Sequence, residues 1–230
     1  MTKTAHFSDI SVCVFDAYGT LFDLGNFAER FRPELGDKAD SLVGLWRRKQ
    51  LEYSWLRTLM GRHTDFWHVT GESLDHAMAA VGLVDPSLRS RLMEAWLAPK
   101  VYAEVPSALE RLQAAGMKTA ILSNGSPSML VSGINVTGLT RLIDEVFSVE
   151  TVGVFKPHPS VYRLVPEHFD IEPKRVCFVS SNGWDVAGAA AYGFRVCWVN
   201  RAKAPAEQLP AGPDAVLTDL NGVVEVLGLS

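Results

Sequence analysis

Apolar runs alternate with stretches of helical spacing along most of the chain. Several runs are rich in β-branched and aromatic residues and lack a polar face, as strands covered on both sides of a parallel sheet do. The predicted strands are residues 10–15, 118–122, 175–179 and 195–199, with weaker candidates at 146–148 and 215–217. The predicted helices between them are residues 106–115, 159–169 and 184–192. This alternation predicts a doubly wound parallel α/β sheet.

The segment from residue 22 to residue 100 interrupts the alternation. It contains no convincing strand, but apolar residues recur at helical spacing in three stretches. These stretches are residues 41–60, 65–83 and 86–99. We therefore expect a helical cap domain, residues 22–100, inserted into an α/β core domain formed by residues 1–21 and 101–230.

Composition and charge narrow the class of protein. The 230 residues are 47% hydrophobic, enough for a sizeable core, and no run approaches the roughly 18 apolar residues of a membrane span. A net charge of −4 provides no field that attracts nucleic acid or an anionic membrane. There is no apolar signal segment at the N-terminus, and the three cysteines lie in apolar runs, which predicts buried free thiols. We expect a cytoplasmic protein without nucleic-acid or membrane partners.

Polar residues gather where the predicted strands end, which is where open α/β sheets bind ligands. One such group could be ordinary turn chemistry, but several that converge on one sheet edge indicate a site. The groups are Asp16 with Thr20, Ser123 with Asn124, Lys156, and Ser180 and Ser181 with Asn182 and Asp185.

These residues, in this order, resemble the haloacid dehalogenase superfamily, whose core is Rossmann-like. The stretches DAYGTLFD, LWRRKQLEYSWL, ILSNGSP, FKPHPSVY and VSSNGWD resemble the L-2-haloacid dehalogenases within it, over nearly the whole chain. The resemblance implies hydrolysis of short L-2-haloalkanoates to D-2-hydroxy acids and halide, without a metal or other cofactor. It also implies a homodimer.

Phosphatases of the same superfamily are the main alternative, and two positions argue against them. Their second aspartate, which protonates the leaving alcohol, is replaced by Tyr18; a halide leaves as a stable anion and needs no proton. Ser180 or Ser181 stands where an acidic Mg²⁺ ligand would be expected. A Mg²⁺-dependent phosphatase and a non-catalytic binding module remain as second and third hypotheses.

The resemblance implies that Asp16 is the nucleophile. Its carboxylate would attack C2 of the substrate with inversion, and water would then hydrolyse the aspartyl ester at its carbonyl carbon. Lys156 and the hydroxyls of Thr20 and Ser180 are candidates for keeping Asp16 ionised. The alternative for Asp16 is a structural cap of the following turn.

The leaving halide needs cationic or polar stabilisation in a dry site. Arg47 matches the family's cap arginine, and Asn124 and the ring edge of Trp184 would complete the halide site. By composition alone, Arg47 would belong to a solvated helix face together with Arg48 and Lys49.

The remaining candidates hold the substrate or orient the catalytic groups. Donors for the substrate carboxylate are Ser123, Lys156 and the backbone N–H groups of Ala17 and Tyr18. The candidates for an apolar pocket wall are Trp46, Leu51, Phe66 and Trp184.

Tyr162, Asp185 and Asn182 complete the candidate site. Tyr162 matches a family tyrosine, and the alternative is a partly buried helix residue. Asp185 would orient Lys156 or the hydrolytic water with help from Asn182, and the alternative is stabilisation of a helix N-terminus.

The apolar end of the first cap helix allows two interpretations. Trp55, Leu56, Leu59 and Met60 would form either the dimer interface or the core of the cap itself, which we favour for Trp55 and Met60. The six histidines are scattered without metal-ligand spacing.

Overall fold

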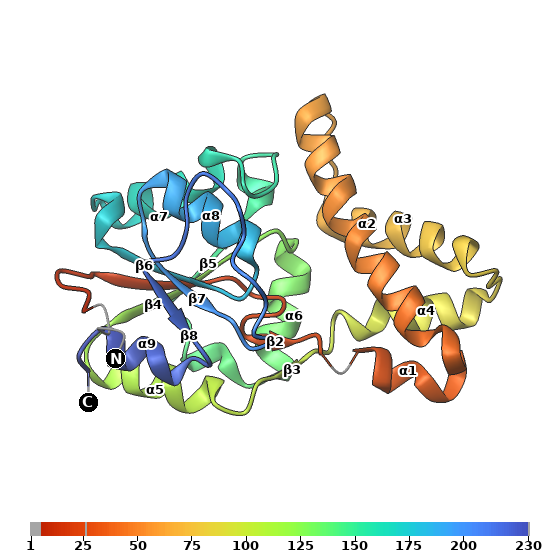
Figure 1. Ribbon diagram of the computed structural model, residues 1–230, viewed down its shortest axis with the longest axis horizontal. Helices are drawn as coiled ribbons and strands as arrows, with labels where there is room; N and C mark the ends of the chain where they lie inside the picture. The colour runs from red at the N-terminus through yellow and green to blue at the C-terminus, as the bar shows by residue number, and fades with distance from the viewer. Residues whose placement is uncertain (1–5, 26, 230) are drawn as a thin grey trace.

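The computed structural model describes residues 6–25 and 27–229, and within them six parallel strands form one sheet (Figure 1). In spatial order they are β5 (Glu145–Ser148), β4 (Lys118–Ser123), β1 (Val12–Phe15), β6 (Val176–Ser180), β7 (Arg195–Val199) and β8 (Ala215–Leu217). All neighbouring pairs are parallel. The predicted sheet is therefore confirmed, with strand ends that differ from the expected ones by at most two residues.

Helices cover both faces of this sheet, which explains why its central strands have no polar face. In Figure 1, α7 and α8 lie above the sheet, and α5 and α9 lie below it. The helices of this body are α5 (Val105–Ala114), α6 (Pro127–Val136), α7 (Pro159–Phe169), α8 (Gly183–Tyr192) and α9 (Asn221–Val226). The sequence pattern did not predict α6 or α9. Single-turn 3₁₀ helices are η1 (Gly36–Lys38), η2 (Leu139–Arg141), η3 (Val149–Thr151) and η4 (Pro173–Arg175).

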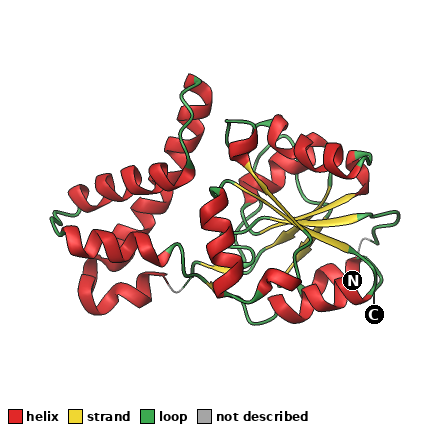
Figure 2. Cartoon of the chain, turned by 180° about the vertical axis from the view of Figure 1, so that it is seen from behind, coloured by secondary structure: helices red, strands yellow, loops and turns green. Residues whose placement is uncertain are grey.

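A second, all-helical body lies beside the sheet and is formed by α1 to α4, which we call the cap helices (Figure 2). They are α1 (Phe27–Leu35), α2 (Ala39–Met60), α3 (Phe66–Ala80) and α4 (Pro86–Ala95). Local signals set their ends: Gly61 ends α2 in the left-handed region, and the Asp65 and Asp85 side chains cap the N-termini of α3 and α4. The helix α1 was not predicted.

The chain enters and leaves the cap helices through two very short strands. These are β2 (Phe22–Asp23) and β3 (Lys100–Val101), which pair antiparallel. The expectation of no strand between residues 22 and 100 is wrong at both ends of that segment, because two-residue strands are too short to produce an apolar pattern. The domain division at these points stays a prediction.

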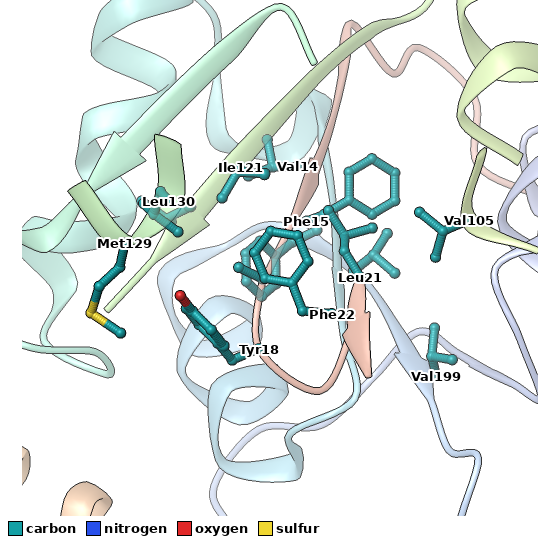
Figure 3. Packing of buried hydrophobic residues seen from close by; sticks show 14 of the residues in the cluster. Val14, Phe15, Tyr18, Leu21, Phe22, Val105, Ile121, Met129, Leu130 and Val199 are labelled. Carbon is teal, nitrogen blue, oxygen red and sulfur yellow. The ribbon is translucent and has the colours of Figure 1, made fainter. Parts of the chain in front are cut away.

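The loop after β1 is anchored by apolar residues on both sides (Figure 3). Val14 and Phe15 precede it and Leu21 and Phe22 follow it, all fully buried. The N–H groups of residues 20, 21 and 22 all donate to the carbonyl oxygen of Ala17. Burying a large apolar side chain contributes about 1.5–3 kcal/mol, so the five-residue span between the two anchors, residues 16–20, is held tightly.

Buried and exposed apolar residues settle two of the expectations. Cys13, Cys177 and Cys197 are buried free thiols, as predicted. Leu59 and Met60 are 83% and 63% exposed, so assigning Met60 to a cap core is wrong. These residues lie in the last turn of α2, beyond the part of the helix that packs on α3.

In the described residues no helix has the length and apolarity to cross a membrane. The expectation about the N-terminus falls partly on residues 1–5, outside the described residues.

Candidate active site

Asp16 is the first residue after β1, and β1 lies between β4 and β6 at the middle of the sheet. Its carboxylate is almost fully buried. Oδ1 accepts from Lys156 Nζ at 3.3 Å, while Oδ2 accepts from Asn182 Nδ2 at 2.8 Å and from Thr20 Oγ1 at 3.1 Å. These donors satisfy a carboxylate that would otherwise be destabilised by burial.

Lys156 is fully buried and lies between two carboxylates. Its Nζ donates to Asp185 Oδ2 at 2.8 Å in addition to Asp16, and it lies 5.0 Å from the centre of the Phe178 ring. Its backbone N–H donates to Asn124 Oδ1 at 2.9 Å, which fixes the loop before α7. A buried ammonium requires such pairing, because its desolvation is expensive.

Asp185 and Tyr162 form the next layer around Lys156. The Tyr162 hydroxyl donates to Asp185 Oδ1 at 2.8 Å, and both residues are fully buried. Burial raises the pKa of Asp185 from 3.8 to about 6, although Lys156 acts in the opposite direction. Burial and Asp185 also raise the pKa of Tyr162 well above its ordinary value, so Tyr162 remains a donor. These contacts favour the orienting interpretation of Asp185 over helix capping.

Asn182 and Thr20 connect the polar residues that follow β1 with those that follow β6. Asn182 occupies the N-cap position of α8, yet its amide donates to Asp16 and to the Tyr18 carbonyl oxygen instead of capping the helix. Thr20 Oγ1 accepts from the Ser181 N–H at 2.9 Å. Ser180 Oγ accepts from the Asn182 N–H at 3.1 Å, so Ser180 reaches Asp16 through Asn182 rather than by the direct hydrogen bond that we expected.

The end of β4 supplies Ser123 and Asn124, both buried. Ser123 Oγ accepts from the Gly125 N–H at 3.1 Å. The amide oxygen of Asn124 is engaged by Lys156, so its nitrogen is the end that can donate to a ligand. Among the residues that the structure describes, no hydrogen bond uses the N–H groups of Ala17 or Tyr18.

The cap helices contribute Arg47, which lies on α2. Its Nη1 donates to Gln50 Oε1 at 2.5 Å, and its guanidinium lies 5.7 Å from the centre of the Trp96 ring. Burial lowers the pKa of Arg47, while the nearby charge of Asp16 acts in the opposite direction. A cavity of about 80 Å³ adjoins Arg47, and its other lining residues are Leu24, Phe27, Val43, Trp46 and Trp96. The interpretation of Arg47 as part of a solvated face is therefore wrong.

Tyr18 extends from the loop after β1 towards the cap helices. Its hydroxyl donates to the Trp96 carbonyl oxygen at 3.3 Å, and its ring packs against Phe22 and Trp96. Burial raises its pKa above the ordinary value, which keeps the hydroxyl protonated. It is therefore an aromatic wall with an engaged hydroxyl, in the position where a phosphatase has a carboxylate.

Phe66 and Trp184 meet residues from the opposite body. The N–H of Phe66, at the start of α3, donates to Glu150 Oε1 at 3.2 Å. The Trp184 ring packs edge-on against Trp55 of α2, with ring centres 5.6 Å apart. The assignment of Trp55 to the cap core is therefore corrected: its aromatic contact crosses from the cap helices to α8.

The sequence interpretation missed Gln50 and Trp96, which both contact Arg47. Gln50 carried a usable signal, because it is a polar residue within the apolar stripe of α2 that contains Leu42 and Trp46. Trp96 carried none, since an apolar residue at the end of an amphipathic stretch is expected to be core.

No group of three or more His, Cys, Asp or Glu side chains within the described residues has the arrangement to hold a metal ion. The metal-free reaction itself stays a prediction.

Comparison with known proteins agrees with the fold. The haloacid dehalogenase-like hydrolase family matches residues 10–193. The chain belongs to this family and, by the relatives that follow, to its (S)-2-haloacid dehalogenase group, which confirms the resemblance.

Three relatives illustrate this likeness. An (S)-2-haloacid dehalogenase 1 of Pseudomonas sp. (strain CBS-3) is 42% identical, over 95% of this chain and 96% of the relative. An (S)-2-haloacid dehalogenase of Xanthobacter autotrophicus is 44% identical, over 91% of this chain and 83% of the relative. A solved L-2-haloacid dehalogenase from X. autotrophicus with chloropropionic acid covalently bound is 37% identical, with a TM-score of 0.86, covering 95% of this chain and 98% of that chain.

Proposed function

We propose that this hydrolase converts short L-2-haloalkanoates into D-2-hydroxy acids and halide through an ester on Asp16. The observation that carries the proposal is a buried carboxylate, held by Lys156, Thr20 and Asn182, in the electrostatic reach of the cap arginine Arg47. A relative with chloropropionic acid covalently bound supports the covalent step.

In the first step an Asp16 oxygen attacks C2 from the side opposite the halogen. A carbon–oxygen bond forms, and the carbon–halogen bond breaks with both electrons leaving on the halide. Oδ1 is the freer oxygen, because Oδ2 accepts two hydrogen bonds and Oδ1 accepts one long contact from Lys156. Arg47, the Asn124 amide nitrogen and the edge of Trp184 stabilise the departing halide.

The substrate carboxylate needs donors that are not already engaged. The N–H groups of Ala17 and Tyr18 donate to no acceptor within the described part of the chain, which supports this role for them. Ser123 and Lys156 are the further donors. Phe66 and Trp184 form the apolar walls that exclude water from the alkyl group.

In the second step water attacks the carbonyl carbon of the ester, and the bond from that carbon to the ester oxygen breaks. The ester oxygen, which came from Asp16, stays on C2 as the product hydroxyl, and the water oxygen becomes part of the Asp16 carboxylate. One water proton ends on the product hydroxyl and the other is released with the halide. Asp16 regains its carboxylate, and the configuration at C2 stays inverted. Asp185, held by Lys156 and Tyr162, orients the groups around this carbonyl.

A Mg²⁺-dependent phosphatase is the weaker candidate. Its general acid would have to be Tyr18, whose hydroxyl is engaged with Trp96 and whose pKa is raised by burial. Such an enzyme would release phosphate and lose activity with EDTA, whereas a non-catalytic module would be indifferent to a change at Asp16.

The test measures halide release from L- and D-2-chloropropionate, with and without EDTA. We expect release from the L form alone, unchanged by EDTA, and reduced by at least about 10⁴-fold in Asp16→Asn, because the nucleophile is removed. Asp170→Asn is the matched control: it makes the same chemical change at an exposed left-handed position where Asn is tolerated. No halide from either enantiomer would overturn the proposal.

We also propose that the apolar end of α2 pairs with a second copy of the chain. Leu56, Leu59 and Met60 are exposed there. Analytical ultracentrifugation should show a dimer that Leu59→Glu dissociates and Val84→Glu, at a 95% exposed position elsewhere, leaves intact. A monomeric wild type would contradict this. Location in the cytoplasm stays a prediction.

A further inference from the structure

A buried series of hydrogen bonds connects Arg47 of α2 to α3. Arg47 Nη1 donates to Gln50 Oε1, Gln50 Nε2 donates to Thr70 Oγ1 at 2.7 Å, and Thr70 Oγ1 donates to the Phe66 carbonyl oxygen at 2.6 Å. Gln50 and Thr70 are fully buried. Trp46 Nε1 donates to the Thr70 carbonyl oxygen at 2.8 Å and fixes the same turn of α3.

The donors and acceptors in this series of hydrogen bonds follow one consistent direction. Because the Thr70 hydroxyl gives its proton to the Phe66 carbonyl oxygen, it must accept from Gln50, and the end of Gln50 that faces it is the nitrogen. The amide oxygen then faces Arg47. If the Gln50 amide were rotated, its NH₂ group would face the guanidinium of Arg47, which is also a donor, and Thr70 would lose its donor. These contacts therefore keep the Gln50 oxygen directed towards the guanidinium.

The chemical nature of Gln50 suits an arginine that must bind an anion. An amide oxygen orients the guanidinium but carries no net charge, so the positive charge of Arg47 is left for a ligand. Further along the same two helices, Arg57 of α2 is paired with the carboxylate of Glu72 on α3 at 2.7 Å. That arginine lies outside the candidate site and has its charge neutralised.

We propose that Gln50 and Thr70 are positioning residues that aim Arg47 at the halide as it leaves C2. The inference rests on the proposed dehalogenation, and it assigns to this buried pair a role beyond holding α2 against α3. Its effect belongs to the transition state, where negative charge develops on the halogen. Stabilisation of that charge matters most for the poorest leaving group.

The experiment measures single-turnover halide release from L-2-chloropropionate and L-2-iodopropionate at saturating substrate. In Gln50→Met, which keeps length without the amide, we expect release of chloride to slow about tenfold and release of iodide about twofold, tenfold being 1.36 kcal/mol of barrier. Gln50→Glu should slow chloride release at least as much, because its carboxylate neutralises Arg47. Thr70→Val, nearly the same in shape, should also slow chloride release more than iodide release, because Gln50 loses the hydrogen bond that fixes its orientation.

Ser54→Ala is the matched control. Ser54 is also a fully buried polar residue of α2, but its hydroxyl donates only to the Leu51 carbonyl oxygen of its own helix. This variant should release both halides at the wild-type ratio of rates. Thermal unfolding of each variant separates loss of fold from loss of positioning, and Thr70→Val carries the test if Gln50→Met folds poorly.

Equal slowing of chloride and iodide in the Gln50 and Thr70 variants, or unchanged rates with a lower melting temperature, would overturn the positioning role and leave a structural one. Failure of the wild type to release any halide would instead overturn the proposed function. The two failures are therefore distinguishable within one set of measurements.

Discussion

The two halves of the site are built in different ways. On the core side, two loop residues, Asp16 and Lys156, are joined by hydrogen bonds to Asp185 of α8, which also binds Tyr162 of α7. On the cap side, Arg47 is held through Gln50, with the Trp96 ring beside it. The core half contains mutually dependent buried charges, whereas the cap half presents one cation beside a small cavity.

This difference indicates in which half of the site a substitution should lower both stability and activity. Removing Lys156 from the core network would leave two buried carboxylates without their shared cation, so folding and activity should fall together. Removing Arg47 takes away a charge that burial already disfavours, so activity should fall alone.

The largest effect is expected for Lys156→Met. Asp16 and Asp185 would remain buried without their shared cation, and we expect a loss of about 3–5 kcal/mol in the free energy of unfolding together with loss of halide release. Urea unfolding measures the first and a halide assay the second. The control is Lys118→Met, which breaks a more exposed pair with Asp144 and should change stability by no more than about 1 kcal/mol. Similar losses in both variants would remove the contrast.

A smaller effect, on rate alone, is expected for Arg47→Met. The turnover number for chloride release should fall about 10²–10³-fold, the range typical of a lost transition-state donor. The free energy of unfolding should change by about 1 kcal/mol or less, because the unpaired Gln50 oxygen is offset by relief of a desolvated charge. The exposed neighbour Arg48 provides the control as Arg48→Met. A large loss of stability would show that the cap half is built like the core half.

The smallest effect is a dependence on pH. The pKa of Asp185 lies at about 6, and the ionised form holds Lys156, so turnover should decline as the pH falls through about 6. The sign for stability is opposite: between 3.8 and about 6 the folded state binds a proton that the unfolded state releases, so the Asp185 contribution to stability grows as the pH falls. Asp185→Asn should be slower but lack this acidic decline. An unchanged decline in that variant would assign it to another group.

The sequence predicted the sheet and the positions of the core half for a physical reason. A strand covered on both faces needs an apolar run, and a parallel sheet brings strand ends such as Asp16, Ser123 and Ser180 to one edge whatever the loops do. Arg47 was found through the family resemblance, because its helical surroundings alone favoured a solvated face.

The missed features depend on contacts between segments that no periodicity relates. The Gln50–Thr70 link requires the packing of α2 on α3, and the Trp55–Trp184 contact requires the placement of the cap helices against α8. The pairing of β2 with β3 joins residues almost eighty positions apart over two-residue strands. Such contacts are decided by tertiary structure and leave only weak signals in the sequence, such as a glutamine within the apolar stripe of a helix.

The two short paired strands also bear on how such a protein can change over evolution. Because β2 and β3 lie side by side, the whole helical insertion leaves and re-enters the core at one point, and the six-stranded sheet takes no strand from it among the described residues. An insertion attached in this way can be lengthened, shortened or exchanged without altering the order of the sheet. Under the proposed mechanism, such changes would alter the surroundings of the departing halide, while Asp16 and its hydrogen-bond partners in the core stay in place.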